Sequence, residues 1–268
     1  MTDRTMISSG QYLEHFKSIP KHVRWTPARI EQSMRDTLGA RPDTGDLWIF
    51  GYGSLIWNPV CQFDIQHKAI LEGWHRSFCL RTIAGRSSPQ LPGRMLSLEP
   101  GGITEGVALR LPARALENEL PLLWIREMPT GAYRPTWSPI AMEDGTRPTA
   151  LTFVADRNHQ LYEPNASVAS VAALIASACG PLGTNADYLF KLKESLASWN
   201  VADSYVDNLV DAVVRRQAEC VDAGGDLYPC LQRMGVIHPG YVPARREFRE
   251  DPTQCEPTVR LLRSGIPD

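Results

Sequence analysis

The chain has 268 residues, of which 43% are hydrophobic and 22% charged, an ordinary composition for a globular protein. Its formal net charge of −2 offers no excess of cations to attract nucleic acid or anionic lipid. No apolar run approaches the roughly 18 residues of a membrane span. We therefore expect a small-molecule or protein partner, and neither nucleic acid nor membrane.

The N-terminal sequence and the cysteines indicate the compartment. The first residues, MTDRTMISSGQYLEHF, lack the charged and apolar regions of a secretory signal. No two cysteines form a C-x-x-C pair, so we interpret all six as reduced thiols and expect a cytoplasmic protein. No two of the six histidines stand three to five residues apart, as zinc ligands commonly do, so we expect no metal site.

Residues 1–45 are polar and are interrupted by prolines, with amphipathic stretches at Gln11–Phe16 and Ala28–Leu38. We interpret this region as an N-terminal extension that packs on the core. The organised part, a predicted domain over residues 46–217, begins with the apolar run Leu47–Phe50. Because glycines follow this run closely, it predicts a buried strand that ends in a tight turn.

Further strands are predicted where apolar residues alternate. They are Arg76–Thr82, Arg94–Leu98, Glu105–Leu111 and Thr149–Ala155. Turn residues such as Pro100-Gly101-Gly102 are expected to separate the strands, which favours antiparallel connections.

Helical patterns follow the strands. Asn165–Cys179 stops at Gly180-Pro181, Thr184 or Asn185 can cap the next helix, and Asp203–Glu219 repeats the pattern. Residues 218–268 have little periodicity and are interpreted as an irregular C-terminal tail. Strands followed by helices predict an α+β domain on an antiparallel sheet, which can close into a barrel.

The segment IFGYGSLIW allows several interpretations. A dinucleotide-binding turn needs a small residue where Ile56 stands, and a serine-nucleophile elbow around Ser54 needs a glycine two residues after it. A plain strand and turn remains open. So does a site in which glycines leave backbone N–H groups free to hold a carboxylate or an oxyanion, which suits the amino-acid end of a γ-glutamyl compound.

Glu127 stands where an apolar pattern expects a core residue, since Leu120, Leu123 and Trp124 precede it at helical spacing. Burial without a partner raises a carboxyl pKa, as a general base near neutral pH requires. The structural alternative is an ion pair. Neighbours on a helix do not face each other, which argues against Arg126 as the partner, whereas a distant arginine such as Arg94 remains open.

Together these segments resemble the ChaC-like branch of the γ-glutamylcyclotransferases. The matching pieces appear in the family's order and cover roughly residues 46–215. They are WIFGYGSLIW at 48–57, PGR at 92–94, GVALRLP at 106–112, WIREMPTGAY at 124–133 and ACGPLGTNADYLFKLKESL at 178–196. Two departures are Glu105, where the family often has an aromatic residue, and Pro129–Ala132, where Gly-Gly is common. The second borders the expected pocket, so substrate preference follows less directly than reaction type.

The resemblance implies a small mixed β-barrel with flanking helices. It implies an enzyme that cleaves glutathione to 5-oxoproline and Cys-Gly without a cofactor, with Glu127 as catalytic acid/base. The residues implied in binding the glutamyl group are Ile49, Phe50, Gly51, Tyr52, Gly53 and Ser54. Tyr133 and Arg94 are either pocket neighbours or structural hydrogen-bond donors. The alternatives are a cyclotransferase for other γ-glutamyl amines or amino acids, and a non-catalytic γ-glutamyl-binding regulatory protein.

Overall fold

The computed structural model describes residues 4–222. The helices are α1 (Arg4–Ser8), α2 (Gln11–Glu14), α3 (Pro27–Gly39), α4 (Leu116–Glu127), α5 (Val168–Ser177), α6 (Asn185–Ser198) and α7 (Ser204–Asp222), with a 3-10 turn at Ala113–Ala115. The strands are β1 (Leu47–Gly51), β2 (Ile65–Thr82), β3 (Gly93–Leu111), β4 (Tyr133–Pro139), β5 (Ala141–Met142), β6 (Thr149–Ala155), β7 (Cys179–Gly180) and β8 (Gly183–Thr184). No described helix is long and apolar enough to cross a membrane.

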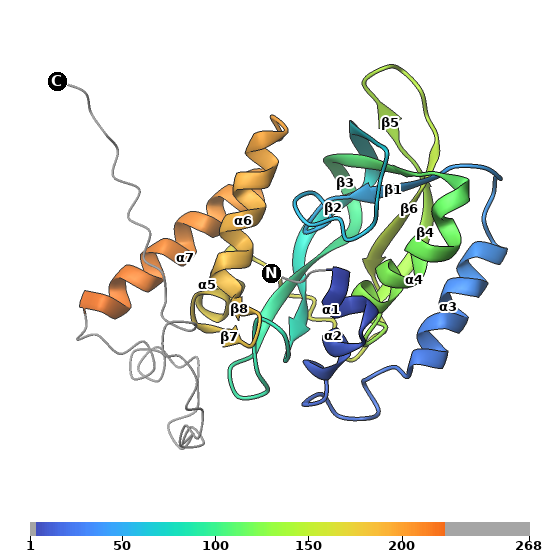
Figure 1. Ribbon diagram of the computed structural model, residues 1–268. Coiled ribbons are helices and arrows are strands. Elements are labelled where there is room, and N and C mark those ends of the chain that lie inside the picture. The colour runs from blue at the N-terminus through green and yellow to red at the C-terminus, as the bar shows by residue number, and fades with distance from the viewer. Residues whose placement is uncertain (1–3, 223–268) are drawn as a thin grey trace.

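The main sheet has six strands in the order β4-β6-β1-β3-β2-β5. The pair β1–β6 is parallel and the other pairs are antiparallel, so the sheet is mixed. Its two edges, β4 and β5, are not joined by a strand ladder in the described part of the chain. The α+β class and the mixed sheet are confirmed, whereas the sheet curls into a half-barrel instead of closing (Figure 1).

The two long strands β2 and β3 correct one prediction. Pro100-Gly101-Gly102 does not separate two strands, because β3 runs through it and stays paired with β2 on both sides. Gly101, Gly102 and the opposing Gly73 have φ values of 104°, 73° and 82°. These positive values are natural for glycine. They form a bulge that bends the paired strands without ending them.

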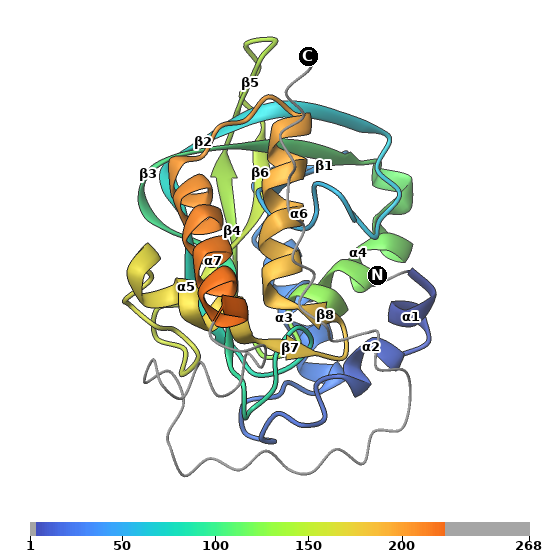
Figure 2. The same ribbon diagram turned by 90° about the vertical axis from the view of Figure 1, so that its left-hand side faces the viewer.

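Two layers of helices cover the sheet. α5, α6 and α7 lie on one side and α3 and α4 on the other (Figures 1 and 2). β1 serves both layers, since side chains alternate along a strand. Leu47 and Ile49 pack with α3 and α4, whereas Phe50 packs with α5–α7.

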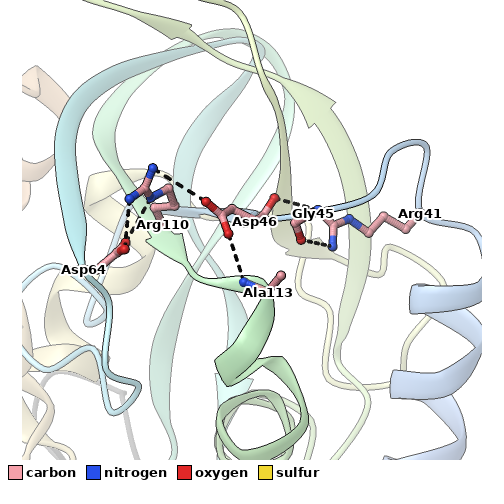
Figure 3. A network of polar contacts seen from close by, with 6 residues as sticks. All are labelled: Arg41, Gly45, Asp46, Asp64, Arg110 and Ala113. Atoms are coloured by element: carbon pink, nitrogen blue, oxygen red, sulfur yellow. Dashed lines mark hydrogen bonds and ion pairs between the residues drawn. The ribbon is translucent and has the colours of Figure 1, made fainter.

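The junction between the N-terminal region and the sheet is held by polar contacts (Figure 3). Arg41 donates to the carbonyl oxygens of Gly45 (3.1 Å) and Asp46 (2.6 Å). The Asp46 carboxylate accepts from the backbone N–H of Ala113 at 2.9 Å, and Arg110 lies 3.6 Å from it. The start of β1 is therefore tied to the start of the segment that leads into α4.

The later helices begin close to where the sequence predicts. Thr184 caps α6, its hydroxyl oxygen accepting from the backbone N–H of Asp187 at 2.9 Å. α7 continues to Asp222, five residues past the predicted boundary at 217. The rest of the predicted C-terminal tail, residues 223–268, lies outside the described residues.

Candidate active site

Glu127 is the last residue of α4, and Met128 after it leaves helical geometry with φ −112° and ψ 24°. Leu120, Leu123 and Trp124 on the same helix are fully buried against the sheet, which fixes the direction of its C-terminal end. The Glu127 side chain is 14% exposed. The apolar pattern thus predicts correctly that this carboxylate is directed toward the interior.

Glu127 lines two neighbouring hollows that share lining residues. The first, which we call the inner recess, is about 20 Å³ and is lined by Tyr52, Gly53, Ser54, Leu55, Leu96, Glu127, Tyr133, Phe153 and Tyr188. The second, the outer cavity, is about 170 Å³. Ser54, Glu127, Tyr133 and Tyr188 line both. The glycine turn and Glu127, 73 residues apart in the sequence, therefore lie in one site.

The turn contributes only part of its predicted residues to these hollows. Tyr52, Gly53 and Ser54 line the inner recess. Ile49 and Phe50 lie in β1 and are fully buried, Gly51 ends that strand, and none of the three lines either hollow.

The backbone of the turn is poor in internal partners. Within the described chain, the N–H groups of Gly53, Ser54 and Leu55 donate to no protein acceptor, while the carbonyls of Gly53 and Ser54 accept from Ile56 and Asn58. A Cβ on Gly53 would lie 3.1 Å from both Leu96 Cδ2 and the Tyr188 hydroxyl. The missing side chain therefore keeps the recess open beside these N–H groups.

Arg126 is the partner of Glu127, which corrects the argument against this pairing. Its Nε lies 3.3 Å from Glu127 Oε1. Its Nη2 donates to Ser54 Oγ at 2.6 Å, and its Nη1 donates to the Asn58 carbonyl. Neighbours face apart on a regular helix, but the helix ends at Glu127 and both long side chains bend toward the turn. One guanidinium thus connects the carboxylate to the glycine turn.

Burial raises the pKa of Glu127, and the Arg126 charge opposes this rise without cancelling it. A carboxyl group whose pKa is raised in this way suits proton transfer near neutral pH.

Four tyrosines surround the carboxylate. Burial raises the pKa of Tyr12, Tyr52, Tyr133 and Tyr188, and the negative charge of Glu127 raises each further. The value for Tyr188 is about 12. The phenols therefore remain protonated donors. Tyr52 donates to the Phe153 carbonyl at 2.6 Å and Tyr133 to the Leu96 carbonyl at 2.8 Å.

Tyr133 and Arg94, whose roles the sequence leaves undecided, differ in their position relative to the site. Tyr133 lines both hollows, whereas Arg94 lines neither. Arg94 is buried, its Nη2 lies 3.7 Å from the Glu163 carboxylate, and its backbone N–H donates to Asn185 Oδ1. Arg94 is thus neither a pocket neighbour nor the partner of Glu127.

Sequence reasoning missed three contributions. The helical rule on neighbours sets Arg126 aside as a partner of Glu127, and no sequence pattern assigns Tyr188 to the site. Tyr12, Phe16 and Ile19 of the N-terminal region line the outer cavity, although no pattern pointed to them. Among the described residues, no group of three or more histidine, cysteine, aspartate or glutamate side chains is placed to hold a metal ion.

Comparison with known proteins gives consistent matches. Residues 47–216 match the family described as ChaC-like protein. A protein of Escherichia coli (strain K12), named glutathione-specific gamma-glutamylcyclotransferase, is 44% identical over 219 residues, which are 82% of this chain and 95% of that protein. The human glutathione-specific gamma-glutamylcyclotransferase 1 is 31% identical over 70% of this chain and 83% of its own length.

The fold also matches a solved structure. A yeast gamma-glutamyl cyclotransferase specific to glutathione superposes with a TM-score of 0.60 at 21% identity, covering 64% of this chain and 97% of the yeast chain.

Proposed function

Because this chain belongs to the ChaC-like protein family, we propose that it is a glutathione-specific γ-glutamylcyclotransferase, an enzyme that releases 5-oxoproline and Cys-Gly. The observation that carries the proposal is the meeting of a buried carboxylate, Glu127, with the Tyr52–Ser54 turn at one recess. The 44% identity with the E. coli protein of that name supports the choice of substrate.

The reaction is an intramolecular aminolysis. Glu127 accepts a proton from the α-ammonium group of the glutamyl residue. The freed amine attacks the γ-carbonyl carbon, and a five-membered ring closes. Glu127 then returns the proton to the departing amide nitrogen as the carbon–nitrogen bond breaks. The ring nitrogen gives its second proton to the freed amine of Cys-Gly, which leaves a neutral lactam. The nucleophile belongs to the substrate, so these steps require no enzyme nucleophile.

Two features of the recess supply the catalytic advantage. A glutamyl chain held folded, with its amine near its own carbonyl, gains orientation that in favourable cases is worth roughly 7–11 kcal/mol. The unpaired N–H groups of Gly53, Ser54 and Leu55 are donors for the developing oxyanion. Loss of one such donor typically costs about 3–4 kcal/mol.

We keep Ile49–Ser54 as the glutamyl-binding segment, with a division of roles. Direct contact is assigned to Tyr52, Gly53 and Ser54, which line the recess. Ile49, Phe50 and Gly51 form the strand that carries them and fixes their position.

We further propose residues 46–217 as the catalytic unit and the cytoplasm as its compartment. Among the described residues, Cys61 and Cys79 are buried thiols outside any disulfide, as is common where disulfides do not persist.

The test compares the wild-type protein with Glu127→Gln, which keeps the shape but removes the base. The wild type should convert glutathione to 5-oxoproline and Cys-Gly, whereas Glu127→Gln should lose the activity. Glu117→Gln, an exposed glutamate on the same helix, is the matched control and should keep it. Normal release of Cys-Gly by Glu127→Gln would remove Glu127 from the mechanism. Parallel assays with γ-glutamylcysteine and a γ-glutamyl amine test the substrate preference.

A further inference from the structure

The outer cavity has a wall that the family resemblance does not supply. Tyr12, Phe16 and Ile19 line it, and all three precede residue 47, where the family match begins. The inference drawn from this wall rests on the proposed function, because it concerns the part of the substrate that leaves.

The wall is fastened to the catalytic helix and to the segment after it. Arg4 forms a two-pronged ion pair with Glu119 of α4, at 2.5 and 2.7 Å. The Tyr12 hydroxyl donates to the carbonyl of Arg126 at 3.2 Å, and the backbone N–H of Trp25 donates to the Pro129 carbonyl at 2.9 Å. Two of these attachments precede Glu127 and one follows it, so the N-terminal region that carries the wall is held on both sides of the carboxylate.

A second part of the outer cavity lining brings positive charge. It includes the end of β2 and the loop after it, with the cations Arg81 and Arg86. Arg86 Nη1 donates to the Thr184 carbonyl at 3.1 Å, and Arg81 lies 3.7 Å from the Glu163 carboxylate. A leaving dipeptide carries one carboxylate, which is drawn toward the cations. The side chain of that dipeptide is then left among the apolar part of the lining, which includes Phe16.

Phe16 is the member of this wall nearest to solvent. Tyr12 and Ile19 are buried, whereas Phe16 is partly buried. The ring of Phe16 meets that of Tyr12 edge-on, with centroids 5.2 Å apart. Tyr12 is also bonded to Arg126, so Phe16 is backed by a side chain that has little room to move.

We propose that Phe16, backed by Tyr12 and Ile19, determines specificity by limiting the size of the side chain on the leaving group. The small thiol side chain of Cys-Gly fits beside the Phe16 ring. A bulky substituent on the sulfur meets the Phe16 ring. The N-terminal region thus selects free glutathione over its S-substituted derivatives.

The experiment measures kcat/KM for glutathione and for S-benzylglutathione in the full-length protein and takes their ratio. The wild type should favour glutathione. Phe16→Ala should raise the relative use of S-benzylglutathione by about tenfold or more, the lower end of discrimination by an apolar pocket. Phe16→Leu keeps more apolar contact and should give a smaller rise, whereas Phe16→Trp should lower the ratio. Leu13→Ala is the control, because Leu13 lies in α2, three residues before Phe16, and does not line the cavity.

An unchanged ratio in Phe16→Ala, Phe16→Leu and Phe16→Trp would overturn the proposal. An equal rise in Leu13→Ala would also overturn it, because the effect would then reflect general loosening of the segment. Failure of the wild type to cleave glutathione would instead refute the proposed function itself.

Discussion

Arg126 offers a prediction in which charge and geometry can be separated. The guanidinium lies 3.3 Å from the Glu127 carboxylate and also donates to Ser54 and Asn58. Arg126→Met removes the charge and the hydrogen bonds together. Arg126→Lys keeps a positive charge but loses the planar fork that reaches the turn.

The direction of the pH effect follows from the sign of the charge. Glu127 acts as a base when ionised, and the positive charge of Arg126 lowers its pKa against the rise caused by burial. Removing that charge raises the pKa further, so the acidic limb of kcat/KM moves to higher pH. An opposite charge within 4–6 Å shifts a carboxyl pKa by roughly 1–3 units. On the acidic limb, Arg126→Met should therefore lose about tenfold or more in kcat/KM.

The assay is the rate of 5-oxoproline release from glutathione across the acidic and neutral range. Arg126→Lys should keep its limb near that of the wild type while kcat falls, because the turn loses its anchor. Ser54→Ala, which removes one anchor and no charge, should likewise leave the limb in place. A profile of Arg126→Met that superimposes on the wild-type profile would refute the electrostatic role.

Two further predictions concern the turn and the N-terminal attachment. In Gly53→Ala the new Cβ lies 3.1 Å from Leu96 and Tyr188, so kcat/KM for glutathione should fall about tenfold to a hundredfold, whereas Gly39→Ala, with open space around it, should retain the activity. Full activity in Gly53→Ala would mean that the recess does not hold the reacting group. The Arg4 ion pair lowers the pKa of Glu119, so its stabilisation is present above the ordinary value of 4.5 and is lost as pH falls through the lowered pKa. The unfolding free energy of Arg4→Gln, measured in urea, should be lower than that of the wild type by about 1 kcal/mol at neutral pH, since Arg4 is partly exposed, and the difference should shrink in acid. A difference independent of pH would exclude the ion pair as its cause.

The sequence predicts the core of the site because two strong local signals coincide there. Glycines directly after a buried strand predict the turn, and a carboxylate in an apolar helical stripe predicts an inward direction for Glu127. Both are properties of a single element, which a sequence pattern can carry. Their meeting in one recess depends on how β1 and α4 pack, and only the family resemblance suggested it.

The remaining features depend on geometry that a linear pattern does not contain. Arg126 contacts Glu127 because α4 ends at Glu127, and the rule that adjacent helical residues point apart no longer applies there. The strand β4 was not predicted, since Pro135 and Pro139 interrupt its pattern; as an edge strand it accommodates them. The Pro-Gly-Gly segment predicts a turn that separates two strands, whereas glycines on the paired strands β2 and β3 make a bulge there.

The bulge divides the β2–β3 hairpin into two parts with different structural roles. Beyond it in one direction, Val107 and Ala108 of β3 pair with β1 and hold the strand that leads into the glycine turn. Beyond it in the other direction, Met95 and Leu96 supply walls of the outer cavity and the inner recess. Successive side chains of a strand point to opposite faces of the sheet. Deletion of one bulge glycine would therefore move the side chains of one part of the hairpin to the opposite face relative to the other part. The bulge thus sets the part of β3 that pairs with β1 relative to the part that lines the hollows, although it lies outside both hollows.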